Sequence, residues 1–156
     1  MKTITRFFLL MAAIVASTSM SFAAEAKIDF ETVGNTWTWS TFEYAPAWSI
    51  VANPSATGIN TSAHVGKLVV NPTDQPWAGV QCAKGEFGPL TISATNHIIK
   101  VMVYKDVISP VGVKLVTATD ASKGEIKVSN TKINEWEELT FDFTSQIDPA
   151  MIYTGI

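Results

Sequence analysis

The side chains with the clearest chemical potential in this sequence are its five tryptophans. An indole face can lie flat on the C–H patch of a pyranose ring, while neighbouring amides and carboxylates hydrogen-bond to the sugar hydroxyls. The candidate sugar contacts are Trp77 with Gln81, Tyr104 beside Lys100, Trp136 beside Glu138, and the pair Trp37 and Trp39. The alternative is that these rings pack in the core, which is the simpler interpretation for most of them.

Catalytic groups are sparse. The chain has two histidines, His64 and His97, each within an expected strand and neither within a catalytic motif. It contains no nucleophile elbow, phosphate-binding glycine loop, paired-cysteine motif or zinc-protease motif. Glycosidic cleavage needs two carboxyl groups across a cleft. Glu135, Glu137 and Glu138 flank a single strand instead, and we expect them to form a solvated charge run. The sequence therefore predicts that the protein is not an enzyme.

The elements that must position these residues are short apolar segments. They are rich in Val, Ile, Thr and aromatic residues and are separated by Gly, Pro, Asn, Asp and Ser. That pattern is typical of an all-β sandwich or barrel. Strands are expected over residues 28–33, 36–42, 48–51, 64–70, 77–82, 96–104, 111–119, 125–128 and 136–143. The last of these alternates most clearly, which directs Leu139, Phe141 and Phe143 inward.

The 77–82 segment is the expected strand with the most exposed chemistry. Alternation places Trp77, Gly79 and Gln81 on its outer face and Cys82 on its inner face. Cys82 is the only cysteine, so it forms no internal disulfide and is expected to be a small buried residue. Residues 151–156 resemble the start of a further strand. Because they end on apolar Ile156, we expect the last strand of the fold to be missing through C-terminal truncation.

The N-terminal residues are typical of a secretory signal peptide. Lys2 and Arg6 supply its positive charge, residues 7–16 are apolar, and the small residues that follow allow cleavage after Ala23 or Ala26. The expected organisation is a signal peptide over 1–23 and one domain over 24–156, secreted to the periplasm or the extracellular space. The apolar run is too short and wrongly flanked for a membrane span.

Removing this leader leaves an acidic domain. Of the 11 Lys and Arg residues, two lie in the leader, so nine remain against 14 Asp and Glu residues and the net charge is −5. Such a domain lacks the basic stripe that holds a phosphate backbone. Nucleic acid is therefore not expected as a partner.

Two sets of motifs resemble a known type of module. The first set resembles the opening of jelly-roll carbohydrate-binding modules of the galactose-binding-like superfamily. It consists of Asp29-Phe30-Glu31, a tryptophan-containing segment and His64-Val65-Gly66-Lys67-Leu68. The second set looks like a module of secreted bacterial polysaccharide-degrading proteins. It consists of Ala52-Asn53-Pro54 with residues 57–62, then Pro76-Trp77-Ala78-Gly79-Val80, and then residues 136–143. Such modules are often found beside laminarinase-type β-glucanase domains. The order of the motifs carries the resemblance, which covers nearly the whole mature chain.

The resemblance implies a two-sheet antiparallel β-sandwich of the jelly-roll type. It implies non-catalytic binding of a β-glucan or similar polysaccharide, beside a separate glycoside hydrolase. It also implies one structural calcium ion, with Glu31 and the backbone at Lys67 as ligands, although an acid at position 31 can instead simply face water. Two other interpretations stay open. One is a structural or adhesive β-sandwich whose tryptophans are all core, and the other is a fragment of a glycoside hydrolase.

Overall fold

The computed structural model describes residues 28–44 and 46–156, in which the regular structure is β-strand apart from one 3₁₀ turn. The expected signal peptide lies outside these residues. The strands are β1 (Trp39–Phe42), β2 (Ala47–Ala52), β3 (His64–Val69), β4 (Gly79–Cys82), β5 (Ile98–Tyr104), β6 (Pro110–Lys114), β7 (Val116–Thr117), β8 (Glu125–Ser129), β9 (Trp136–Asp142) and β10 (Tyr153–Gly155). The 3₁₀ turn η1 spans Thr144–Gln146. The all-β class expected from the sequence is confirmed. In the described part of the chain, no helix has the length and apolar character needed to cross a membrane.

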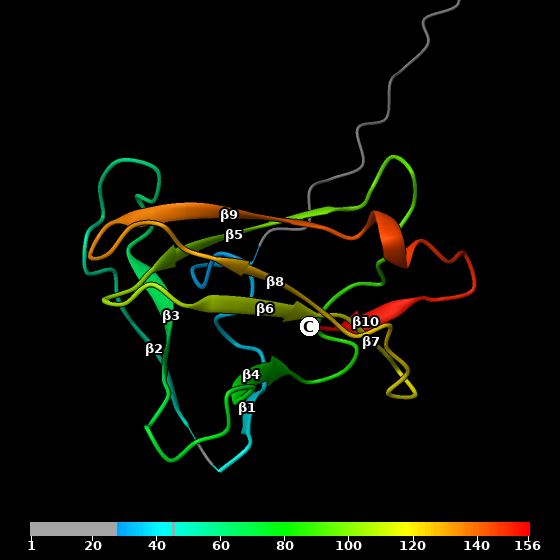
Figure 1. The fold of residues 1–156 in the computed structure, drawn as a ribbon, viewed down its shortest axis with the longest axis horizontal. Coiled ribbons are helices and arrows are strands. Elements are labelled where there is room, and N and C mark those ends of the chain that lie inside the picture. Colours follow the sequence, from blue (N-terminus) through cyan, green and yellow to red (C-terminus); the bar gives the residue numbers. More distant parts are fainter. Residues whose placement is uncertain (1–27, 45) are drawn as a thin grey trace, which may run out of the picture.

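The strands associate as antiparallel pairs. β5 pairs with β9 along its whole length, from Ile98 opposite Asp142 to Tyr104 opposite Trp136. β6 pairs with β8, β2 with β3, β1 with β4, and β7 with β10. In Figure 1 the β5–β9 pair forms the upper layer, β8 lies beside β9, and the β1–β4 pair lies below β6. The long β5–β9 ladder is the element that positions the candidate site.

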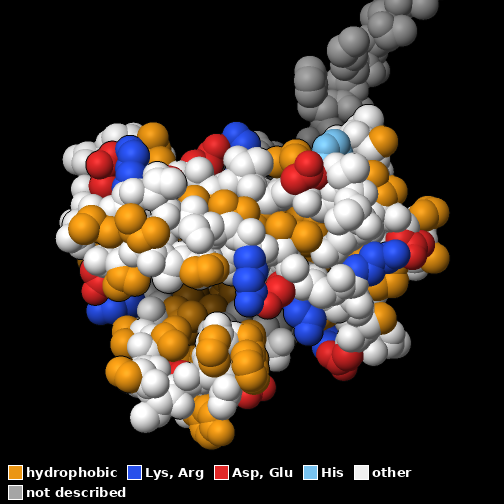
Figure 2. All heavy atoms as spheres, viewed as in Figure 1, with side chains coloured by type: hydrophobic (Ala, Val, Ile, Leu, Met, Phe, Trp, Pro, Cys, Tyr) orange, Lys and Arg blue, Asp and Glu red, His pale blue; other side chains and the backbone are white. Residues whose placement is uncertain are grey.

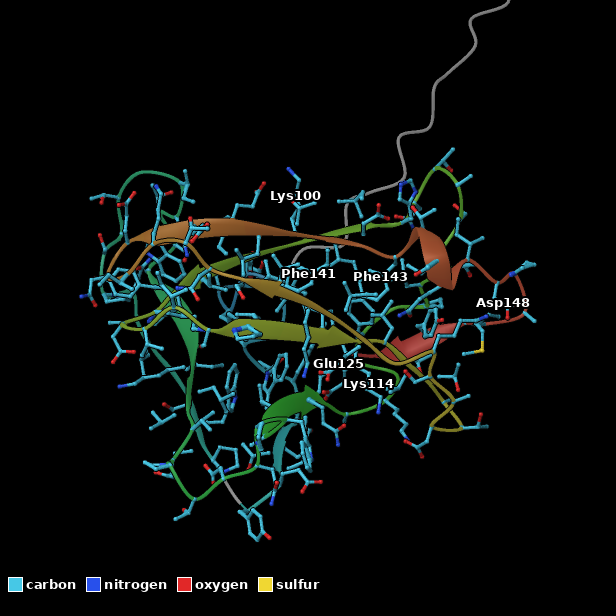
Figure 3. All side chains as sticks on the ribbon, in the orientation of Figure 1. Lys100, Lys114, Glu125, Phe141, Phe143 and Asp148 are labelled. Carbon is cyan, nitrogen blue, oxygen red and sulfur yellow. The ribbon has the colours of Figure 1, made fainter. Side chains whose placement is uncertain are left out.

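The core lies on the inner side of β9 and is built by the alternation of that strand. Leu139, Phe141 and Phe143 are at most 3% exposed, which confirms the inward row expected from the sequence. Figure 3 shows Phe141 and Phe143 on the inner side of this layer and Lys100 on its outer side. Leu115, fully buried between β6 and β7, extends the same core and divides the strand expected over 111–119. Burial of each such side chain stabilises the fold by about 1.5–3 kcal/mol.

The C-terminal segment is part of that core. Tyr153 is fully buried, pairs with Thr117 of β7 and forms a further bridge to Leu90. The backbone at Gly88 passes so close that a Cβ there would lie 2.5 Å from the Tyr153 carbonyl oxygen. Its φ of 84° also favours glycine. The strand expected to start within 151–156 is therefore present, over Tyr153–Gly155.

Residues 28–33 do not form the strand that their alternation predicted. The Asp29 Oδ1 atom instead accepts hydrogen bonds from the backbone N–H groups of residues 31–33, at 2.9–3.0 Å. These bonds curl the chain into a turn, with Phe30 in the left-handed region at φ 58°. They also hold the pKa of Asp29 well below its ordinary value, and the Val33 N–H contributes most to this shift. The side chain of Asp29 thus competes successfully with strand pairing.

The strand expected over 77–82 begins two residues later, because the chain turns before it. The Ala78 N–H donates to the Gln75 carbonyl at 2.8 Å, so Trp77 lies in a turn, where it is 54% exposed. The prediction that Trp77 belongs to the outer row of this strand is therefore wrong, although the residue is exposed. Cys82, at the end of β4, is free and buried as expected.

Candidate functional site

A groove opens at the end of the molecule where β9 begins, with a volume of about 390 Å³. Its first wall is the 53–63 loop between β2 and β3, which lines it with Ser55, Thr57, Gly58 and Ile59. Its second wall is the 130–135 loop between β8 and β9, which lines it with Lys132, Asn134 and Glu135. Trp136, Glu137 and Glu138 of β9 complete the lining. Figure 2 shows acidic and basic side chains side by side at this end of the molecule.

Trp136 is held in one orientation by its neighbours. Its indole N–H donates to the Asn53 Oδ1 atom at 3.1 Å and to the Ser55 carbonyl at 2.9 Å. The ring of Tyr104, opposite Trp136 in the β5–β9 ladder, meets the indole at a centroid distance of 5.5 Å and an interplanar angle of 61°. Such edge-to-face contacts fix the relative orientation of two rings. The indole is therefore oriented without a ligand, and part of its surface still lines the groove.

The first wall is organised by Asn53. Its Nδ2 group donates to the Ser62 carbonyl at 2.9 Å and to the Asn60 carbonyl at 3.3 Å, which closes the 53–63 loop. Its Oδ1 atom accepts from the Ser55 N–H at 2.9 Å as well as from Trp136. One amide side chain thus fixes both the shape of the loop and its distance from β9.

The second wall is organised by Asn130, whose side chain is 1% exposed. Its Oδ1 atom accepts from the Ser109 N–H at 3.0 Å. Its Nδ2 group donates to the Val107 carbonyl at 3.0 Å and to the Lys132 carbonyl at 2.7 Å. These bonds join the connection between β5 and β6 to the 130–135 loop. A second contact between the same two segments runs from the Asn134 N–H to the Lys105 carbonyl, at 2.6 Å.

Glu137 also supports the second wall rather than offering a reactive carboxylate. It accepts hydrogen bonds from the Thr131 N–H at 2.7 Å, the Thr131 hydroxyl at 2.8 Å and the Lys132 N–H at 3.0 Å. These donors lower the pKa of Glu137, and the Thr131 N–H has the largest effect. Glu137 is therefore held as an ionised group that ties the 130–135 loop to β9.

The remaining charges of the groove form exposed ion pairs. Lys132 Nζ lies 2.5 Å from Glu135 Oε1, and this carboxylate raises the pKa of the lysine. The Nζ atom of Lys100, on β5, lies 2.8 Å from Glu138 Oε1. The lining thus contains three carboxylates and one lysine. The groove is acidic even when Lys100, which lies outside the lining, is counted with it.

Trp37 and Trp39, expected as a sugar-binding pair, stack on one another with centroids 5.9 Å apart and planes 28° apart. Both are partly buried and pack against the core. Trp39 also contacts Phe30 and Trp48, with centroids 5.6 and 5.2 Å away, and its indole N–H donates to the Gly34 carbonyl at 2.8 Å. These contacts favour the core interpretation for this pair.

Trp77 and Gln81 lie apart from the groove lining. Gln81 is exposed on β4, opposite Ser40 of β1, and Trp77 lies in the turn before β4. Of the predicted contacts, the structure brings together Trp136 and Tyr104, whereas Trp77 and Gln81 belong to another region. Two further exposed rings, Phe42 and Tyr44, lie at the C-terminal end of β1, where Phe42 pairs with Gly79 of β4, and the sequence did not single them out.

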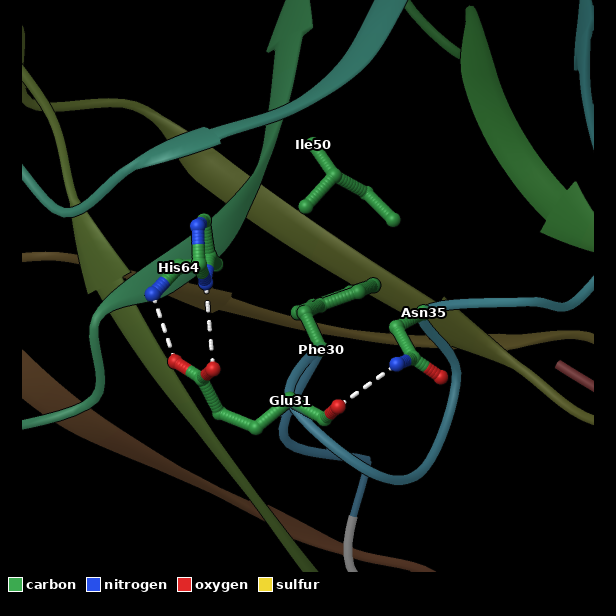
Figure 4. Close-up of a pocket in the computed structure, with 5 residues that line it drawn as sticks. All are labelled: Phe30, Glu31, Asn35, Ile50 and His64. Atoms are coloured by element: carbon green, nitrogen blue, oxygen red, sulfur yellow. Dashed lines mark hydrogen bonds and ion pairs between the residues drawn. The ribbon is translucent and has the colours of Figure 1, made fainter.

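The predicted calcium ligand Glu31 lies at a second, shallower hollow of about 320 Å³, shown in Figure 4. Its Oε1 atom accepts from the His64 N–H at 2.6 Å, and its Oε2 atom lies 3.0 Å from His64 Nδ1. The pKa of Glu31 is lowered, chiefly by the hydrogen bond from the His64 side chain. Phe30 and Ile50 give this hollow an apolar lining.

The two predicted calcium ligands have protein partners in this structure. Both carboxylate oxygens of Glu31 are taken up by His64, and the backbone of Lys67 lies in the β2–β3 ladder opposite Ser49. Among the described residues, no group of three or more His, Cys, Asp or Glu side chains is placed to hold a metal. Calcium at Glu31 and Lys67 stays a prediction.

No family model matches this chain, and neither a curated protein nor a solved structure matches it. The sequence indicated Trp136 and Tyr104, with Glu138 beside Trp136, whereas Glu135 and Glu137 were expected only as part of a solvated charge run. It did not single out the supports Asn53 and Asn130. The available signal was the Asn-Pro-Ser turn that begins at Asn53 within a loop-forming stretch, since Asn often stabilises turns through its side chain.

Proposed function

We propose that the mature chain is a secreted, non-catalytic carbohydrate-binding module whose sugar site is the groove at Trp136. The observation that carries this proposal is the indole itself, oriented by Asn53, Ser55 and Tyr104 and bordered by hydroxyl, amide and carboxylate groups. An aromatic face with polar groups around it is the chemistry that a pyranose ring needs. The fold we propose is a two-sheet jelly-roll sandwich that includes the five antiparallel pairs.

The groove is suited to a polymer rather than to a small enclosed molecule. Its first wall offers the hydroxyls of Ser55 and Thr57, and its second wall offers the Asn134 amide. A chain of sugars can lie between these walls with one ring on Trp136 and its hydroxyls toward either side. We propose a β-glucan or similar neutral backbone as the general ligand type, with a separate glycoside hydrolase acting on the same polysaccharide.

The distribution of acids argues for binding without cleavage. Hydrolysis of a glycosidic bond requires two carboxyl groups that face each other across the sugar. In this groove the three carboxylates come from Glu135, Glu137 and Glu138, on one wall and the adjoining strand, while the 53–63 loop carries no acid. Glu137 is also held ionised by backbone donors, which is the opposite of a general acid.

A structural or adhesive β-sandwich is the second candidate, and one observation favours it. The indole N–H groups of Trp39 and Trp136 both donate to protein acceptors, and Trp37, Trp39 and Trp48 contact other rings. In this alternative Trp136 serves only to anchor the 53–63 loop to β9.

Affinity electrophoresis of the mature chain from Ala24 separates these candidates. Gels contain laminarin, mixed-linkage glucan, xylan or no polysaccharide, and Trp136→Ala and Trp77→Ala are run beside the wild type. Retardation by a glycan that is lost in folded Trp136→Ala and kept in Trp77→Ala supports the groove. Retardation lost only in Trp77→Ala would move the site to the turn before β4. A folded wild type that no glycan retards would favour the structural candidate, and robust release of reducing sugars would contradict the non-enzyme proposal.

A further inference from the structure

The three carboxylates of the groove lining all have protein partners. Glu135 and Glu138 each pair with a lysine, and Glu137 accepts hydrogen bonds from donors of the 130–135 loop. The indole N–H of Trp136 is likewise used, because it donates to the first wall. A ligand therefore meets charges that are already neutralised, which favours a neutral molecule whose polar groups are hydroxyls.

The amide of Asn134 is different from these groups. Asn134 lines the groove from the second wall, and its side chain makes no hydrogen bond within residues 28–44 and 46–156. On the first wall, the hydroxyl oxygens of Ser55 and Thr57 lie 3.3 Å apart, so their contact uses only one of two hydroxyl protons. The groove thus offers a ligand one complete amide and one hydroxyl donor, on opposite walls.

The backbone holds Asn134 in a fixed place. Its φ of 54° lies in the left-handed region, which Asn tolerates better than most other residues. Its N–H donates to the Lys105 carbonyl at 2.6 Å, and two positions earlier the Lys132 carbonyl accepts from the buried Asn130. Because this segment is ordered without a ligand, binding at the amide costs little backbone entropy.

A carboxamide carries an acceptor and a donor side by side. It can therefore bind two neighbouring hydroxyls of one pyranose ring, with Oδ1 accepting from one hydroxyl and Nδ2 donating to the other. Internal rings of a 1,4-linked glucan or xylan keep free hydroxyls on both C2 and C3. In a 1,3-linked glucan the linkage uses the C3 oxygen, and no two adjacent carbons of an internal ring keep free hydroxyls.

We propose that Asn134 binds such a hydroxyl pair on the sugar that stacks on Trp136, so that the groove selects β-1,4-linked neutral backbones over β-1,3-linked ones. This inference rests on the proposed function, since it names the ligand class of the same groove. Trp136 provides the stacking surface, and Asn134 determines which linkage is accepted. The Ser55–Thr57 pair contacts a hydroxyl at the other edge of the ring.

Calorimetric titration of the mature chain with three neutral oligosaccharides of equal length tests this inference. They are a cello-, a xylo- and a laminari-oligosaccharide, of which the last keeps neighbouring free hydroxyls only at its end rings. We expect the two 1,4-linked oligomers to bind about tenfold more tightly than the laminari-oligosaccharide, the size expected for two hydrogen bonds in an exposed groove.

Two substitutions at Asn134 and one control sharpen the test. Asn134→Gly removes the amide at a φ that suits glycine, so it should weaken binding of the cello-oligosaccharide about tenfold and barely change binding of the laminari-oligosaccharide. Asn134→Asp keeps an acceptor without the donor and should also reduce the preference. Asn96→Ala, an exposed change outside the groove lining, should bind all three oligomers like the wild type.

The outcomes separate this inference from the proposed function. Equal or tighter binding of the laminari-oligosaccharide by the wild type, or an unchanged preference in folded Asn134→Gly, would overturn the inference and leave the proposed function standing. A folded wild type that binds none of the three oligomers would contradict both.

Discussion

The substitution Asn130→Ala tests whether the second wall of the groove is held by one buried amide. Asn130 is 1% exposed, and its side chain makes three hydrogen bonds, to the Ser109 N–H and to the carbonyls of Val107 and Lys132. Alanine removes all three and leaves their backbone partners without that contact. The connection between β5 and β6 would then lose its main tie to the 130–135 loop.

The expected cost follows from the number of bonds. A buried hydrogen bond contributes about 1 kcal/mol net to stability, so losing three lowers the free energy of unfolding by about 3 kcal/mol. That is a large share of the roughly 5–15 kcal/mol that stabilises an ordinary domain. The corresponding fall in melting temperature is roughly 10 °C. The Asn134–Lys105 backbone bond remains, so we expect the variant to fold.

Urea and thermal denaturation measure this cost, with Asn96→Ala as the matched control. Asn96 is exposed and its side chain makes one long hydrogen bond, 3.3 Å to the Thr91 carbonyl, so its loss should cost less than about 1 kcal/mol. If Asn130→Ala is no more destabilising than Asn96→Ala, the wall is held by something other than this amide, and the description of the groove is refuted.

Three further predictions concern the core, the Glu31–His64 contact and the free thiol. Phe141→Ala should lower the free energy of unfolding by about 3–5 kcal/mol in urea, because it empties a fully buried position, and a loss under 1 kcal/mol would contradict the core described here. The folded pKa of Glu31 lies below its ordinary value of 4.5, so its stabilising contribution is present above that pH and is lost as the pH falls through the folded pKa. The stability difference between wild type and Glu31→Gln, followed by denaturation at several pH values, should therefore shrink on acidification, and a difference that grows would be inconsistent with the contact. Burial raises the pKa of the Cys82 thiol, so a thiol reagent should modify it much more slowly in the native protein than in urea, and equal rates would show that it is accessible.

Much of the fold could be predicted from the sequence where one local pattern decides the structure. The alternation over 136–143 places Leu139, Phe141 and Phe143 inward, and all three are buried. The failures come from side chains that satisfy the backbone locally. Asp29 accepts from three successive N–H groups and replaces a strand with a turn, although Ile28 and Phe30 alternate with acids as a strand would.

The candidate site could be predicted only in part. Trp136 and Tyr104 were found because each stands in the outer row of a recognisable strand, and strand pairing brings them together. Asn53 was missed because it acts across 83 positions of sequence, through a single bond to the Trp136 indole. Trp77 was misplaced because a turn from Gln75 to Ala78 interrupts an otherwise convincing alternation. Contacts between distant loops depend on how the pairs of strands pack, which local patterns do not specify.

The most direct test of the central proposal is the affinity of a glycan oligomer for the wild type and for Trp136→Ala, measured by calorimetry on folded samples. Trp77→Ala serves as the control, since it also removes an exposed indole, but one that lies in the turn before β4 and outside the groove lining. We predict that the wild type binds and that Trp136→Ala binds about tenfold more weakly or worse, the size of a central aromatic contact, while Trp77→Ala binds like the wild type. Equal affinity of wild type and Trp136→Ala, or no binding by a folded wild type, would contradict it.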